Sequence, residues 1–237
     1  MKTRSLAMRP ALIIFDCDGV LIDSEVLSAR ALIDELACHG VAVDMGFVAR
    51  HFIGRAYPVI VAEVSERFGV TLPDDFEERY RGRLLASFRT GLAAMAGAIE
   101  TVEALQVPAC VATSSSPARL AASLAMVGLD RHFDGRTFTA SEVPRGKPAP
   151  DLFLHAAAVM GADPSTCVVV EDSVPGLLAG LAAGMQVWRF TGGSHLANMD
   201  VPLPVDCRPH RSFASFAELR AALPHLFHPS AGVVNLA

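Results

Sequence analysis

The sequence predicts an α/β fold, a doubly wound, Rossmann-like parallel sheet core with an inserted all-helical cap domain. Short aliphatic runs that suit buried parallel strands alternate with segments of helical pattern. Residues 24–91 break this alternation, because they contain helical patterns only. Hydrophobic residues make up 51% of the 237 residues, so the chain has ample material for a packed core.

The core strands are expected at five apolar runs. Residues 11–15 are Ala-Leu-Ile-Ile-Phe, a short aliphatic run followed by polar residues and Gly19, as expected for a strand buried on both faces. The other runs are 109–112, 136–139, 167–170 and 186–190, of which 136–139 and 186–190 are weaker. Helical patterns between them cover 98–105, 117–127, 150–160 and 175–183. We expect irregular surface structure over 192–212 and a final helix over 213–223.

The inserted segment is expected to form four helices. They would begin at Ser24, Asp44, Pro58 and Asp74, which are residue types that suit helix N-termini. In the last helix, apolar side chains recur every four residues and form one stripe, made of Phe76, Tyr80, Leu84 and Phe88. The expected division is an α/β core from residues 1–23 and 92–237 and a helical cap domain from residues 24–91.

Charge and cysteine content limit the classes of partner. The formal net charge of −5 argues against a nucleic-acid surface, since such surfaces need clustered Lys and Arg. The five cysteines are odd in number and show no metal-binding spacing, so we expect reduced thiols in a cytoplasmic protein. No apolar run approaches the roughly 18 residues of a membrane span, and none has the form of a signal peptide. A soluble monomer without a membrane partner is expected.

Asp16 and Asp18 follow the first predicted strand directly and lie two residues apart. On an extended backbone they project to the same side. Two carboxylates at the end of a buried strand are costly unless a cation or a proton relay uses them. Mg²⁺ prefers such oxygen ligands, and Gly19 allows a sharp turn after the pair. The alternative is a loop with two solvated aspartates.

Hydroxyl groups end the second predicted strand at Thr113, Ser114 and Ser115. These hydroxyls and the nearby backbone N–H groups could hold phosphate oxygens. In isolation, a helix N-cap before Pro117 explains them better.

Lys147 is the only lysine besides Lys2, and it lies in a stiff, Pro-rich turn. The prolines favour a positioned lysine over a solvated surface one. Glu171 and Asp172 end the third long apolar run, where the alternative is a capping carboxylate for the helix at Pro175.

The combination of these groups is more informative than any one of them. In open α/β sheets, ligands bind outside the carboxyl ends of the strands, and each predicted strand delivers its polar group there. An acidic pair, a hydroxyl, a lysine and a second acidic pair together indicate metal-assisted phosphoryl transfer with an enzyme nucleophile.

Taken in order, Asp16-x-Asp18-Gly19, Thr113, Lys147 and Glu171-Asp172 resemble the four motifs of the haloacid dehalogenase superfamily. The resemblance covers residues 11–223, and the ordered set is specific although each piece is weak alone. A helical insert between the first and second motifs resembles the subgroup with a small helical cap. Residues 15–25 also resemble the family's sugar-phosphate phosphatases, including those acting on phosphogluconate or phosphoglycolate.

The resemblance implies a phosphatase that acts on a small phosphorylated metabolite, a sugar or sugar-acid phosphate. By that analogy Asp16 attacks phosphorus and becomes an aspartyl-phosphate, while Asp18 protonates the leaving oxygen and then activates water. Thr113 would orient the phosphoryl group, and Lys147 would offset its negative charge. The implied cofactor is Mg²⁺.

The implied metal ligands are Asp16, Asp18 through its backbone carbonyl, Asp172, and Glu171 directly or through water. The implied phosphate-binding residues are Thr113, Ser114, Ser115 and Lys147.

Other branches of the family fit less well. Dehalogenases lack an acid at the position of Asp18, because halide leaves without a proton. Phosphonoacetaldehyde-cleaving relatives need a cap lysine, which residues 24–91 do not contain. A β-phosphoglucomutase-like phosphosugar mutase stays open, although such relatives carry a cap lysine and a His where this chain has Ser28. A non-catalytic regulatory or binding protein on the same fold is the alternative of another class.

The cap is expected to close over the phosphate site and exclude water. Residues 51–55 join two predicted cap helices, and family analogy places this loop over the active site. Gly54 and Arg55 are therefore candidate substrate contacts, with Arg55 binding a carboxylate or hydroxyl of the substrate. A surface arginine is the alternative.

Overall fold

The structure, a computed structural model, describes residues 9–52, 57–197 and 202–228. Within these ranges, six parallel strands form one sheet in the order β3-β2-β1-β4-β5-β6. The strands are β1 (Leu12–Phe15), β2 (Ala109–Thr113), β3 (Thr137–Thr139), β4 (Cys167–Glu171), β5 (Gln186–Phe190) and β6 (Arg211–Phe213). β1 lies between β2 and β4, so the strand order reverses beside it.

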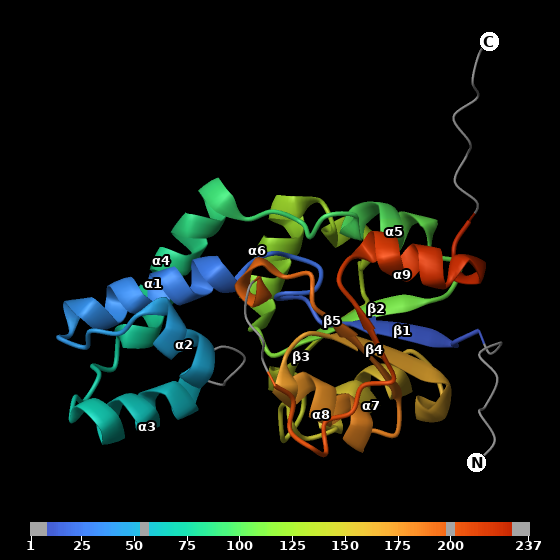
Figure 1. Ribbon diagram of the computed structural model, residues 1–237. Helices are drawn as coiled ribbons and strands as arrows, with labels where there is room; N and C mark the ends of the chain where they lie inside the picture. Colours follow the sequence, from blue (N-terminus) through green and yellow to red (C-terminus); the bar gives the residue numbers. More distant parts are fainter. Residues whose placement is uncertain (1–8, 53–56, 198–201, 229–237) are drawn as a thin grey trace, which may run out of the picture.

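Helices cover both faces of the sheet (Figure 1). α7 (Asp151–Val159) and α8 (Val174–Ala182) lie on one face, and α5 (Ala98–Ala104), α6 (Pro117–Val127) and α9 (Phe216–Ala222) lie on the other. Along β1, Ile13 and Phe15 enter one apolar cluster while Leu12 and Ile14 enter the opposite one, as the alternation of strand side chains requires. The doubly wound α/β fold is confirmed.

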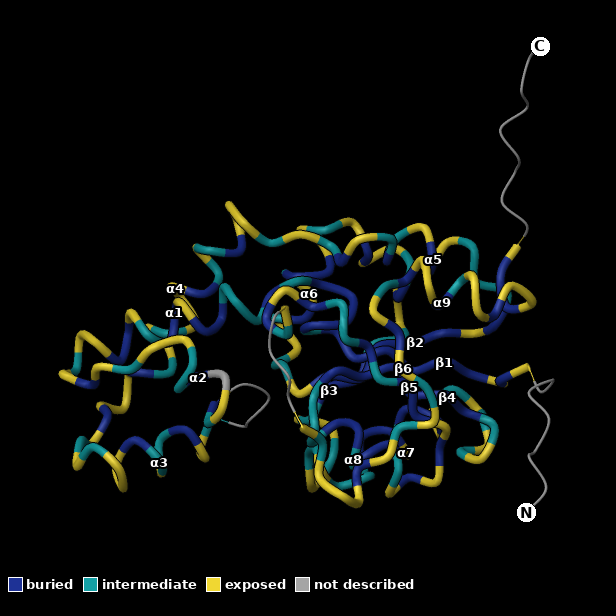
Figure 2. Tube along the Cα trace, viewed as in Figure 1, coloured by how far each residue is buried: buried dark blue, intermediate teal, exposed yellow. Residues whose placement is uncertain are grey.

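Short 3₁₀ turns complete the core at η1 (Asp130–His132), η2 (Ala140–Glu142), η3 (Pro164–Thr166), η4 (Ser194–Leu196) and η5 (Pro224–Leu226). Figure 2 shows that the central strands are buried along their length while the helices expose their outer sides. None of the helices in the described ranges is long and apolar enough to cross a membrane.

The helices inserted after β1 lie to one side of the sheet (Figure 1). These cap helices are α1 (Glu25–Cys38), α2 (Met45–His51), α3 (Tyr57–Phe68) and α4 (Phe76–Gly91). They have apolar clusters of their own, and the predicted stripe of α4 faces inward, with Phe76, Leu84 and Phe88 buried and Tyr80 half-buried. The division into a core and a cap domain of residues 24–91 remains our proposal.

Two expectations about the end of the chain were wrong. Residues 211 and 212 were expected to be irregular and residue 213 to begin the final helix, but residues 211–213 form β6, in which Arg211 pairs with Trp188 of β5. Three residues with one buried apolar side chain carry no periodic signal, so the pairing depends on the edge of the sheet. The final helix accordingly begins at Phe216, not at 213, with Ser215 as its N-cap.

Of the residues expected to begin helices in the cap, Asp44 acts as a helix cap in the structure, whereas Ser24 and Asp74 do not. The side chain of Asp44 accepts a hydrogen bond from Phe47 N at 2.7 Å, as a capping residue does. Ser24 precedes α1 without capping it, because its hydroxyl donates to another side chain. Asp74 lies one residue before Asp75, the N-cap of α4.

Phe216 is central to one face of the core, and its removal tests the packing. The ring is 0% exposed, and its centroid lies 6.4 Å from that of Phe15 and 4.9 Å from that of Phe190. We expect Phe216→Ala to lower the free energy of unfolding in urea by about 3–5 kcal/mol, because it leaves a cavity. Val205→Ala, at a side chain that is 83% exposed, should change it by less than about 0.5 kcal/mol. Equal effects of the two substitutions would contradict this packing.

Candidate active site

The polar groups predicted from the sequence meet at the carboxyl edge of the sheet. Asp16 follows β1, Thr113 ends β2 and Glu171 ends β4. A cavity of about 380 Å³ opens there between the core and the cap helices. Its core side is lined by Asp16, Asp18, Thr113, Ser114, Ser115, Lys147, Glu171 and Asp172. The structure thus brings together every site residue expected in the core.

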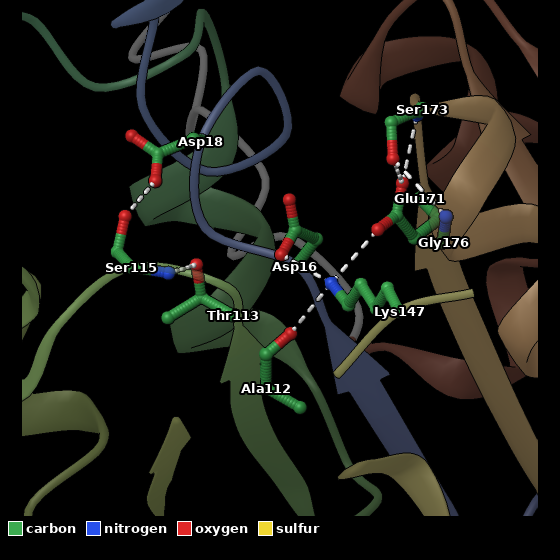
Figure 3. Close-up of polar contacts among 9 residues, drawn as sticks. All are labelled: Asp16, Asp18, Ala112, Thr113, Ser115, Lys147, Glu171, Ser173 and Gly176. Carbon is green, nitrogen blue, oxygen red and sulfur yellow. Dashed lines mark hydrogen bonds and ion pairs between the residues drawn. The ribbon is translucent and has the colours of Figure 1, made fainter. Parts of the chain in front are cut away.

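Lys147 joins two of the carboxylates (Figure 3). Its Nζ donates to Asp16 Oδ1 at 2.7 Å, to Glu171 Oε1 at 2.8 Å and to the carbonyl of Ala112 at 3.0 Å. Its three ammonium donors therefore all have partners. Burial acts to lower the pKa of Lys147, but Asp16 and Glu171 together raise it. Lys147 is positively charged and fixed, not a solvated surface lysine.

Three carboxylates crowd together beside this lysine. Oxygen atoms of Asp16, Glu171 and Asp172 lie within 4.8 Å of one another, and all three residues are buried. Burial raises the pKa values of Asp16 and Asp172 well above their usual range, and the neighbouring acidic groups raise them further. One ammonium cannot offset three ionised carboxylates. A hard divalent cation with oxygen ligands would do so, so these residues fit Mg²⁺.

Glu171 is oriented by the start of α8 (Figure 3). Its Oε2 accepts hydrogen bonds from Ser173 N at 2.7 Å and from Ser173 Oγ at 3.0 Å. Ser173 itself caps the helix, because its Oγ accepts from Gly176 N at 3.2 Å. The capping role considered for the acidic pair therefore belongs to Ser173. A Cβ atom at Gly176 would lie 1.7 Å from Glu171 Oε1, so only glycine leaves room for this carboxylate.

Gly19 brings Asp172 close to the loop that follows β1. Its φ of 77° confirms the sharp turn expected after the first acidic pair. A Cβ atom there would lie 2.0 Å from Asp172 Oδ2. Glycine is needed at this position for both its backbone conformation and its lack of a side chain.

Asp18 lies outside the carboxylate cluster, in a different electrostatic environment. Its Oδ1 accepts hydrogen bonds from Ser24 Oγ at 2.6 Å and Arg119 at 2.7 Å, and its Oδ2 accepts from Ser115 Oγ at 2.6 Å. Burial acts to raise the pKa of Asp18, but the charge of Arg119 and these hydrogen bonds lower it. Asp18 is therefore a carboxylate in the ligand-free protein. Environments that shift the pKa values of Asp16 and Asp18 in opposite directions suit separate acid–base roles.

Arg119 is a site residue that the sequence analysis missed. It lies in the first turn of α6, and its guanidinium also contacts Ser28 Oγ at 3.2 Å and lies over the ring of Phe88 at 5.5 Å. It therefore connects the core to two cap helices. A positive charge in the first turn of a helix opposes the helix dipole, and this unfavourable placement could have drawn attention to it.

His195 is a second missed residue. Its Nε2 lies 3.1 Å from Asp172 Oδ2. Its segment has no periodic pattern, so only the folded chain shows this contact. Cys17, between the two aspartates, packs into the apolar core.

The cap side of the cavity is part apolar and part polar. It includes the rings of Phe52, Tyr57 and Tyr80 together with the Arg81–Glu77 ion pair. The predicted substrate contacts Gly54 and Arg55 lie outside the described residues.

Comparisons with known proteins agree with this geometry. A family model described as a haloacid dehalogenase-like hydrolase matches residues 10–184. The chain is 33% identical over 184 residues to 6-phosphogluconate phosphatase of Escherichia coli K12, covering 77% of this chain and 83% of that protein. It is 33% identical over 178 residues to hexitol phosphatase B of the same organism, covering 73% and 80%. A HAD family hydrolase from Deinococcus radiodurans R1, solved with bound phosphate and sodium, is 35% identical with a TM-score of 0.72, covering 93% and 98%.

Gly176→Ala tests whether the position of the Glu171 carboxylate beside Gly176 is needed for the response to Mg²⁺. We expect Mg²⁺ to raise the melting temperature of the wild-type protein. The added methyl would displace Glu171, so we expect a much smaller rise in the variant. Gly82→Ala is the matched control, because a Cβ at Gly82 meets nothing within 4 Å. Thermal unfolding with Mg²⁺ or with EDTA measures the difference. A full Mg²⁺ response in Gly176→Ala would contradict the placement of Glu171.

Glu25→Gln tests whether burial and the nearby carboxylates raise the pKa of Glu25. Burial, Asp18 and Asp172 raise the pKa of Glu25 to about 8 from its usual 4.5. The folded protein therefore keeps a proton on Glu25 that the unfolded chain loses, and stability falls as the pH rises between these two values. In EDTA, we expect the variant to lose less unfolding free energy than wild type between pH 5 and 9, by about 1 kcal/mol or more. Glu78→Gln, at an exposed position, should follow wild type, and parallel curves for all three proteins would contradict the raised pKa.

Proposed function

The chain belongs to the haloacid dehalogenase-like hydrolases and is a phosphatase of that family. We propose that it hydrolyses a sugar or sugar-acid phosphate, that it uses Mg²⁺, and that the reaction passes through a phosphorylated Asp16. One observation carries this proposal. Lys147 Nζ contacts both Asp16 and Glu171 at the edge of a cluster of three buried carboxylates. Such a site combines a fixed nucleophile, a fixed positive charge and ligands for a divalent cation.

Asp16 is the proposed nucleophile. Lys147 holds its Oδ1, and no hydrogen bond to Oδ2 is found among the described residues, so Oδ2 is available to attack phosphorus. A bond then forms between this oxygen and phosphorus while the ester P–O bond breaks. Lys147 offsets negative charge on Asp16 and on the phosphoryl group during this step.

Asp18 is the proposed acid and base. It is ionised in the ligand-free protein, but a phosphate dianion bound beside it would raise its pKa and favour the protonated form. Asp18 would then give its proton to the leaving oxygen. As a carboxylate again, it would take a proton from the water that hydrolyses the aspartyl-phosphate and restores Asp16.

The phosphoryl group would be held by residues that end β2. Thr113 Oγ1 accepts a hydrogen bond from Ser115 N at 3.2 Å, which orders this turn (Figure 3). Hydroxyl and backbone N–H groups of Thr113, Ser114 and Ser115 are the proposed donors to phosphate oxygens. Asp16, Glu171, Asp172 and the carbonyl of Asp18 would hold Mg²⁺, which when bound neutralises charge on the phosphoryl oxygens.

The substrate class rests on the relatives. Two that align over most of their length are a 6-phosphogluconate phosphatase and a hexitol phosphatase, and the similar Deinococcus structure contains phosphate. The half-apolar, half-polar cap side of the cavity suits a leaving group with carbon and hydroxyl surfaces. Gly54 and Arg55 remain proposed contacts to it. We further propose that the enzyme is a monomer and that it is cytoplasmic. Its five free cysteines suit the reducing environment of the cytoplasm.

The test measures phosphate release from a panel of hexose phosphates, hexitol phosphates and phosphorylated sugar acids, with Mg²⁺ or EDTA. We expect Mg²⁺-dependent release that Asp16→Asn lowers by about four orders of magnitude or more. The control Asp206→Asn, at an exposed position away from the cavity, should retain full activity. Conversion of glucose-1-phosphate to glucose-6-phosphate without release would instead indicate the mutase. Release that survives Asp16→Asn would contradict the mechanism.

A further inference from the structure

Residues 191–197, which follow β5, pack against the loop that carries the acidic pair. Thr191 N donates to the carbonyl of Phe213 at 2.8 Å, which fixes the start of the segment to β6. Ser194 donates to Asp23 Oδ1 from its backbone N at 3.1 Å and from its Oγ at 2.7 Å. The segment is thus fastened both to the sheet and to the chain that leads into α1.

The ring of His195 points from this segment to Asp172. Its side chain is 5% exposed and that of Asp172 is 4% exposed, and Nε2 lies 3.1 Å from Asp172 Oδ2. When Nε2 carries a proton, this contact places an N–H group beside the carboxylate oxygen. The other ring nitrogen, Nδ1, is buried and has no hydrogen-bond partner in the described part of the chain.

Glycines leave the space that this contact needs. A Cβ atom at Gly193 would lie 2.6 Å from Cε1 of His195, although its φ of −66° is one that any residue adopts. A Cβ atom at Gly19 would lie 3.0 Å from the same Cε1 and 2.0 Å from Asp172 Oδ2. Gly193 is therefore required by the ring of His195 and not by its own backbone conformation.

Each of the three carboxylates of the cluster has a polar side chain in contact with it. Asp16 is held by Lys147, and Glu171 is held by Lys147 and Ser173. His195 supplies the corresponding contact to Asp172, with Nε2 at 3.1 Å from Oδ2. A carboxylate with one oxygen fixed in this way presents its other oxygen in a set direction.

We propose that His195 is a positioning residue for the metal site: by fixing Oδ2 of Asp172 it aims this carboxylate at the cation. This inference rests on the proposed function, which places Mg²⁺ among Asp16, Glu171 and Asp172. His195 does not touch the substrate or the reacting atoms in this account.

The test measures the dissociation constant for Mg²⁺ and for Mn²⁺ by calorimetry and by Mn²⁺ electron paramagnetic resonance, in protein shown to be folded by circular dichroism. We expect His195→Ala to raise the constant about 10–100-fold. Gly193→Ala should do the same, because its methyl displaces the ring, and His195→Gln should restore part of the affinity through its amide N–H. In assays, the metal concentration for half-maximal activity should rise more than kcat at saturating metal falls.

Matched controls separate positioning from packing. His155 faces Glu142 at 3.5 Å in another histidine–carboxylate pair away from the cavity, so His155→Ala should keep wild-type metal affinity. Gly82→Ala serves in the same way for Gly193→Ala.

Wild-type metal affinity in folded His195→Ala would overturn this inference and leave the proposed function intact. Where His195→Ala does not fold, wild-type affinity in both His195→Gln and Gly193→Ala would overturn it equally. Equal weakening in the His155→Ala control would also overturn it. A wild-type protein that binds neither ion would overturn both this inference and the proposed metal dependence.

Discussion

The burial of three carboxylates around a single lysine is the constraint on which the rest of the site depends. Removing carboxylates from water is costly, and Lys147 offsets only part of the charge of Asp16, Glu171 and Asp172. The part of this free-energy cost that Lys147 does not offset accounts for the groups that surround the carboxylates. Hydrogen-bond donors orient the carboxylates, glycines make room for them, and the raised pKa values of Asp16 and Asp172 mark the place where a cation would be most stabilising.

The same strand end supports two different chemistries because its two aspartates have different neighbours. Asp16 faces the lysine and the carboxylate cluster, while Asp18 faces an arginine and two hydroxyls. Arg119 belongs to the core but also contacts Ser28 and Phe88 of the cap helices. The environment of Asp18 therefore depends on how the cap packs on the core, which links substrate enclosure to acid–base chemistry.

Local patterns were sufficient to predict the parts of the molecule that local physics determines. Buried parallel strands are short aliphatic runs, and their carboxyl ends meet at one edge, so Asp16, Thr113, Lys147 and Glu171 could be placed together from the sequence. β6 could not be predicted, because three residues become a strand only by pairing with β5. The roles of Arg119 and His195 were equally hidden, since each depends on contacts with residues distant in the sequence.

The central claim is that Asp16 carries the phosphoryl group during turnover. Rapid-quench mixing with a substrate bearing radiolabelled phosphate, followed by peptide mapping, tests it most directly. The account predicts a transient, acid-stable label on the peptide that contains Asp16, formed and lost at rates that support the steady-state turnover. A label on another residue, or turnover without any labelled protein, would contradict it.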